Sequence, residues 1–112
     1  MKIALPTNGD SLEDELAFHF GRAKNFLIFN TEKENFEVYP NPEVKGKATL
    51  PPDFLKGLGV NVVICFSLGP RAFNLFKSYK IETKKAVKKN IKENINLFQK
   101  GKLKDLAKED IF

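Results

Sequence analysis

The sequence predicts a single α/β domain, residues 1–112, built on a mixed five-stranded sheet with helices on its faces. Five short runs have the β-branched and aromatic composition of strands, and turn residues bound each of them. The strand–helix–strand order of the second half predicts parallel neighbours joined by right-handed crossovers. A short polar turn separates the second run from the third, which predicts a hairpin and therefore one antiparallel strand.

The composition narrows the class of protein. The chain has a formal net charge of +5 and a single cysteine. One cysteine excludes an internal disulfide framework, so we expect a reduced, cytoplasmic protein. No apolar stretch approaches the roughly 18–20 residues that span a bilayer, and "MKIALPTNGD" turns polar too soon for a signal peptide, so we expect no membrane contact.

Three strands are expected in the first half, at residues 2–6, 25–30 and 36–40. The first is apolar and ends at Pro6, and the third alternates apolar and polar residues before a proline. Between the first two strands lies a long connection in which "SLEDELA" predicts a helical turn with Ser11 as its N-cap. Long connections of this kind in compact domains often carry function.

The second half is expected to contain a helix at 53–59, a strand at 60–66, a helix from residue 70, a strand at 80–84, a helix at 86–99 and a final helical turn in the tail. Asp53 can cap the first of these helices. The continuous run "VNVVICF" predicts a strand that is buried on both faces. Pro70 suits a first helical turn, and the spacing of Ile91 and Ile95 predicts one apolar helix face.

The stretch "AFHFGRAKNFLIF" holds the only histidine, His19. An imidazole can ligate iron or zinc, accept or donate a hydrogen bond, or act as a base. The alternative is a loop histidine that bonds the backbone while Phe20 and its neighbour anchor the loop to the core. Gly21 predicts a positive φ or a close backbone approach. Arg22 can pair with an anionic ligand, or form a salt bridge to Glu13, Asp14 or Glu15.

Two further loops follow strands that we expect to be parallel neighbours. Asn8 and Gly9 follow the first strand, and Ser67 and Gly69 follow the buried one. The carboxyl ends of parallel strands face one crevice, so these loops and the His19 loop converge there. Free amides ahead of the Pro70 helix could hold an anion. The alternative for all four residues is ordinary turn chemistry.

Cys65 ends the buried strand and has two interpretations. A thiolate binds soft metals and iron–sulfur clusters, whereas a lone cysteine within "VVICF" is commonly a small buried hydrophobe. One cysteine and one histidine cannot fill a conventional four-ligand metal site. A stable cluster would therefore need backbone groups, an exogenous ligand or a second subunit.

Three stretches together resemble the dinitrogenase iron–molybdenum cofactor-binding family of NifX-like small domains. They are "MKIALPTNGDSLEDELAFHFGRAKNFLIF", "GVNVVICFSLGPRAFNLFKSYKIET" and "NINLFQKGKLKDL". The resemblance implies a ribonuclease H-like fold and a non-catalytic carrier or chaperone of an iron–sulfur-type or iron–molybdenum-type cluster. Its partners would be cluster donor or acceptor proteins, and the protein would be a monomer or a weak homodimer.

The chain departs from that family between residues 44 and 53. Relatives often carry a glycine-rich stretch there, whereas "VKGKATLPPDF" has one glycine and no histidine or cysteine. This departure keeps open a second function, a cofactor-free interaction or regulatory module. A nuclease is excluded because "KIALP" and "VVICF" supply no carboxylates for catalytic metals. The lysine-rich helix lacks interleaved aromatic residues, so we do not expect nucleic-acid binding.

Overall fold

The computed structural model describes residues 1–112 and contains five strands and three α-helices. The strands are β1 (Lys2–Thr7), β2 (Asn25–Asn30), β3 (Asn35–Pro40), β4 (Val62–Cys65) and β5 (Glu82–Lys85). The helices are α1 (Pro51–Gly57), α2 (Pro70–Ser78) and α3 (Ile91–Gln99), with short 3-10 turns at Phe20–Arg22 and Lys108–Asp110. All five predicted strands, the helix from residue 70 and the helical turn in the tail are confirmed.

The sheet has the strand order β3–β2–β1–β4–β5. β1, β4 and β5 run parallel, whereas β2 is antiparallel to both of its neighbours. One strand therefore opposes the other four, which confirms the predicted mixed sheet. β1 and β4 lie side by side at its centre, so the segments that follow them meet at one edge.

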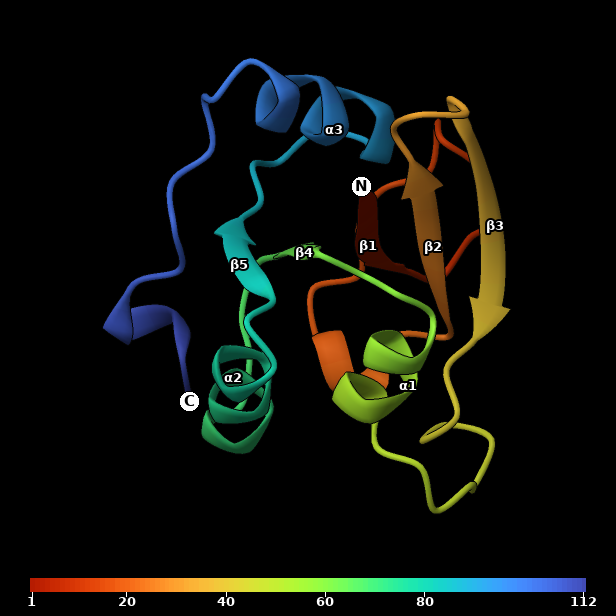
Figure 1. Ribbon diagram of the computed structural model, residues 1–112, viewed down its shortest axis with the longest axis vertical. Coiled ribbons are helices and arrows are strands. Elements are labelled where there is room, and N and C mark those ends of the chain that lie inside the picture. The colour runs from red at the N-terminus through yellow and green to blue at the C-terminus, as the bar shows by residue number, and fades with distance from the viewer.

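Helices cover both faces of the sheet, with α1 and α2 on one side and α3 on the other (Figure 1). Successive side chains of β4 alternate between the two faces: Val63 belongs to the apolar cluster that contains Phe76 of α2, and Val62 to the one that contains Ile91 of α3. All of β4 is buried, as its continuous apolar run predicts. None of the helices combines the length and apolarity needed to cross a bilayer.

The predicted start of the last helix at residue 86 is wrong, because α3 begins at Ile91. Asn90 is its N-cap, and the Asn90 side chain accepts the N–H of Glu93 at 2.8 Å. Asn94 is fully buried and accepts the N–H of Val87 at 2.9 Å. Its amide nitrogen also lies within hydrogen-bond distance of three carbonyl oxygens of residues 87–90. These bonds hold the segment before α3 in a non-helical path.

The predicted cap of the first helix is also wrong. α1 begins at Pro51, and Leu50 occupies the N-cap position. Asp53 lies in the first turn and accepts a hydrogen bond from the Tyr79 hydroxyl. Proline suits this first turn because its missing N–H would have no helical partner. The helix ends as expected, with Gly59 at a φ of +81°.

The segment "SLEDELA" contains turns and no helix, so Ser11 is not an N-cap. The roles are reversed: the Asp14 carboxylate accepts the backbone N–H groups of Asp10 and Ser11, and the Ser11 hydroxyl. These bonds, led by the one from Asp10, lower the pKa of Asp14. Gly9 lies directly against this carboxylate, because a Cβ atom on Gly9 would sit 2.2 Å from Asp14 Oδ2.

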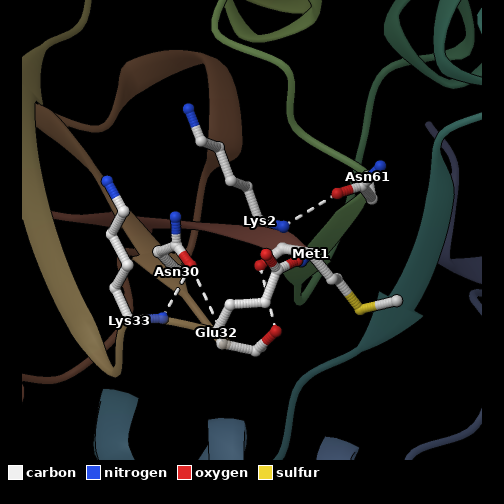
Figure 2. Close-up of polar contacts among 7 residues, drawn as sticks. Met1, Lys2, Asn30, Glu32, Lys33 and Asn61 are labelled. Carbon is white, nitrogen blue, oxygen red and sulfur yellow. Dashed lines mark hydrogen bonds and ion pairs between the residues drawn. The ribbon is translucent and has the colours of Figure 1, made fainter.

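The β2–β3 hairpin is held by its turn (Figure 2). Asn30 Oδ1 accepts the N–H groups of Glu32 at 3.0 Å and of Lys33 at 3.1 Å. The Glu32 carboxylate lies 2.6 Å from the amino group of Met1, which joins the turn to the start of β1. The Met1 amino group therefore lowers the pKa of Glu32.

Replacing Asn94 with alanine is expected to lower the free energy of unfolding by about 2–4 kcal/mol, because the N–H of Val87 and the carbonyl of Lys89 lose their hydrogen-bond partner. Asn96→Ala is the matched control, since Asn96 is exposed on the same helix. Urea unfolding of both variants checks this. Equal losses in the two variants would contradict the structural role of Asn94.

Replacing Gly9 with alanine is expected to lower Tm by about 4–8 °C, because the new methyl group displaces the Asp14 carboxylate from its backbone donors. Gly57→Ala is the control, because no atom lies within 4 Å of a Cβ built there. Thermal unfolding followed by circular dichroism measures both. A Gly9 variant as stable as the Gly57 variant would refute the close approach.

Candidate functional site

The connection between β1 and β2 folds back against the end of β1. The N–H of Ala17 donates to the Pro6 carbonyl at 2.8 Å. The Thr7 hydroxyl donates to the Glu15 carbonyl at 2.9 Å. These bonds fix the connection at the carboxyl end of the strand, which is the edge where ligands bind in sheets of this type.

Phe20 anchors the His19 loop. Its ring is 3% exposed and lies 5.0 Å from the ring of Phe26 and 5.6 Å from that of Phe76. The side chain before it, His19, is exposed, and its ring is perpendicular to that of Phe18, with 5.0 Å between the two ring centroids. Because Phe20 occupies the core, the imidazole is left at the rim of the loop.

The turn that follows, Phe20–Arg22, is held by a residue that sequence analysis missed. Asn41 is fully buried, and its amide donates to the carbonyls of Gly21 at 3.2 Å and of Ala23 at 2.9 Å. Its backbone N–H donates to the Lys24 carbonyl at 3.0 Å. The only sign of this role in the sequence is that Asn41 is a polar residue directly after the predicted strand. Polar residues are common in loops, so this position alone does not predict burial.

The His19 loop and the loop after β4 line one depression of about 320 Å³. Its walls are His19, Phe20, Gly21, Arg22, Ser67, Leu68, Gly69 and Phe112. Six of the eight predicted cofactor-binding residues therefore lie together, from segments more than 40 residues apart in the chain. The buried Ser67 hydroxyl, 3.5 Å from the Phe18 carbonyl, joins the two loops. Phe112 also lines the depression, and sequence analysis did not predict this.

Arg22 is the one charged side chain that lines the depression, and no carboxylate side chain lines it. Arg22 is exposed and forms no ion pair, so the salt bridge to a neighbouring acidic residue that we considered is not made. Helix α2 begins at the same place, with Gly69 as N-cap and Pro70 in its first turn. The free amides of a first helical turn and a guanidinium both favour a bound anion.

Asn8 and Gly9 do not line the depression. Asn8 Oδ1 accepts the N–H of Lys24 at 3.0 Å, and the Gly9 carbonyl accepts the side-chain amide of Asn25 at 2.9 Å. Both residues therefore connect the start of the long loop to its end.

Cys65 lies away from solvent at the end of β4. Its side chain is fully buried in the apolar cluster under α1 and α2, and burial raises the pKa of the thiol to about 12. A protonated, enclosed thiol is a poor metal ligand. No group of three or more His, Cys, Asp or Glu side chains is placed to hold a metal ion. His19 is therefore the one conventional ligand at the depression.

A second depression of about 230 Å³ adjoins the first and shares Phe20, Gly21 and Gly69 with it. It also includes Arg71, which is exposed and forms no ion pair. Sequence analysis missed Arg71, although its place directly after a first-turn proline was a usable signal. Glu43 comes from the loop before α1, and its Oε2 would lie 3.5 Å from a Cβ on Gly21, which is an ordinary contact with a side chain. The positive φ predicted for Gly21 is wrong, because the positive-φ glycines are Gly46, Gly59 and Gly101.

Solved structures share this fold. An NMR structure of a candidate NifB protein from Thermotoga is 27% identical, covers 94% of this chain and 92% of its own, and superposes with a TM-score of 0.79. The apo form of the orange protein from Desulfovibrio gigas has a TM-score of 0.84 over 95% of this chain and 92% of its own. At 20% identity, the orange protein shows the fold alone.

Sequence comparison defines the family. An uncharacterized protein of Methanocaldococcus jannaschii is 37% identical over 109 residues, which cover 92% of this chain and 89% of that protein. The family model described as dinitrogenase iron-molybdenum cofactor matches residues 1–101, which include both loops of the depression. The chain therefore belongs to the dinitrogenase iron-molybdenum cofactor family.

Proposed function

We propose that this protein is a small non-catalytic carrier or chaperone of an anionic iron–sulfur-type cluster, similar to an iron-molybdenum cofactor. One observation carries the proposal: two distant loops form a single depression that holds an unpaired Arg22, an exposed His19 and no carboxylate side chain. Metal–sulfide clusters carry net negative charge, so such a depression attracts them. Membership of the family supports the same cargo.

The groups that could hold a ligand in the depression suit a loosely bound cluster better than a permanently bound metal centre. Residues 19–22 and 67–69 supply one imidazole, one guanidinium and backbone amides, but no set of three metal ligands. The cluster would keep its own bridging and terminal ligands, and the protein would hold its outer surface by charge and hydrogen bonds. Weak ligation suits a carrier, because the cluster must leave intact for an acceptor protein.

The strand order and the single reversed strand support a ribonuclease H-like classification of the fold. We propose that the protein is cytoplasmic. Its one cysteine is a buried free thiol, so the fold needs no oxidising compartment to form a disulfide. Its partners would be the proteins that donate the cluster and accept it. The protein would act as a monomer or a weak homodimer.

A second candidate function is a cofactor-free interaction module, and one feature favours it. Phe18 is 60% exposed, and its ring stacks on that of Phe66 at 6.0 Å. Both rings line a depression of about 350 Å³ with Lys88 and Lys89. The exposed Phe18 ring, stacked on the half-buried Phe66 beside two lysines, suits contact with an acidic protein surface. This function predicts indifference to metal.

Arg22→Gln is expected to weaken cluster binding by about 10- to 100-fold, because it removes the unpaired charge inside the depression. Lys24→Gln is the control: it removes one charge from the same loop, outside the depression, and should change affinity less than about twofold. Anaerobic reconstitution with iron and sulfide, with and without molybdate, followed by visible absorption and metal analysis, measures both.

His19→Ala in the same assay distinguishes metal ligation by His19 from electrostatic attraction by Arg22. If His19 ligates a metal of the cargo, its loss shifts the visible spectrum of the bound cluster, whereas Arg22→Gln lowers occupancy without such a shift. A wild-type protein that binds no more metal than an unrelated control protein would refute the carrier function. The interaction module would then be the remaining candidate.

A further inference from the structure

Residues 102–112 form a strap along the open edge of β5 (Figure 1). The N–H of Lys85 donates to the Lys104 carbonyl at 2.7 Å, and the N–H of Leu106 donates to the Thr83 carbonyl at 3.3 Å. The strap therefore pairs with β5 through one isolated antiparallel bridge, between Lys84 and Asp105. It covers a sheet edge that would otherwise present free backbone groups to solvent.

The strap then crosses to the candidate site. The N–H of Leu68 donates to the Asp110 carbonyl at 3.1 Å, and the N–H of Phe112 donates to the Leu68 carbonyl at 3.0 Å. Phe112 is 69% exposed and lines the depression. The family match covers residues 1–101, so this wall comes from a segment outside the matched region.

One ion pair holds this crossing in place. The Lys85 ammonium pairs with the Asp110 carboxylate and also donates to the Phe66 carbonyl at 3.1 Å. The second oxygen of Asp110 accepts the N–H of Ala107 at 2.8 Å. The hydrogen bond from Lys85 first, and that from the Ala107 N–H second, lower the pKa of the Asp110 carboxyl, which favours its charged form. The strap is thereby tied to β5 and to the end of β4.

We propose that Lys85 and Asp110 are positioning residues that set Phe112 as an apolar wall of the depression, and that this wall selects for cargo with a weakly hydrated surface. The proposal rests on the proposed function and specifies its ligand. Arg22 of the His19 loop supplies the positive charge, and Phe112 of the strap supplies apolar area. A sulfide-bridged cluster has both negative charge and weakly hydrated sulfide edges, whereas a strongly hydrated oxyanion gains little from a phenyl ring.

Cys65 provides a readout of the strap that needs no ligand. Its side chain packs in the same apolar cluster as Leu106 of the strap, and its register partner on β5 is Lys85. Lifting the strap therefore uncovers the region around this thiol. Because Cys65 is the only cysteine, reaction with a thiol reagent such as dithiobis-nitrobenzoate has a single source.

The test compares wild type with Asp110→Asn, Phe112→Ala and the control Glu109→Gln, which removes an exposed, unpaired charge from the same turn. Asp110→Asn should raise the rate of Cys65 modification about tenfold or more and weaken cluster binding. Phe112→Ala should leave that rate unchanged and weaken cluster binding about 3- to 10-fold. The control should match wild type in both assays.

Each variant tests a different part of the proposal. Wild-type rates and affinities in Asp110→Asn would overturn the positioning role, and wild-type affinity in Phe112→Ala would overturn the wall. If Asp110→Asn does not fold, Phe112→Ala still decides whether the wall contributes to binding, since an exposed ring adds little to stability. A wild-type protein that binds no cluster overturns the proposed function itself, and this proposal with it.

Discussion

Phe20 packs between the rings of Phe26 and Phe76, and the arrangement of the candidate site depends on this contact. The long connection between β1 and β2 has no helix or strand of its own beyond one short turn. Burying one phenyl ring in the middle of that connection brings the residue before it and the residues after it to the rim of the sheet. His19 and Arg22 are therefore held near the start of α2 by an apolar interaction that neither of them makes.

The binding properties of the depression depend on the polar groups that have no hydrogen-bond or ion-pair partner within the protein. β1 and β4 are parallel neighbours, so the loops after them share one edge, and α2 begins there with unbonded amides. The acidic residues 13–15 do not pair with Arg22, and Asp14 is occupied by backbone donors. The Arg22 guanidinium thus has no ion-pair partner at a concave surface, while the only thiol is enclosed in the core. This combination suits an anionic object that brings its own metal ligands.

The sequence could predict the features that depend on local pattern. Each strand is a short apolar or alternating run, and parallel pairing of two of them was enough to predict that the loops of His19 and Gly69 converge. It could not predict the roles of Asn41 and Asn94, because a single buried amide is defined by carbonyl groups that only the folded chain brings near it. The start of α3 was misplaced for this reason: apolar spacing continues back to Val87, but the Asn94 side chain holds that segment out of the helix. The strap has too few apolar residues to show a strand period.

The central claim is that the depression between the two loops receives the cluster, and paramagnetic NMR tests it most directly. The ¹H–¹⁵N spectrum of the protein would be recorded before and after anaerobic addition of iron and sulfide. The account predicts that signals are broadened for amides of residues 19–22, 67–69 and 112, while those of the loop 45–49 keep their intensity. Broadening centred elsewhere, or uniform broadening across the chain, would contradict it.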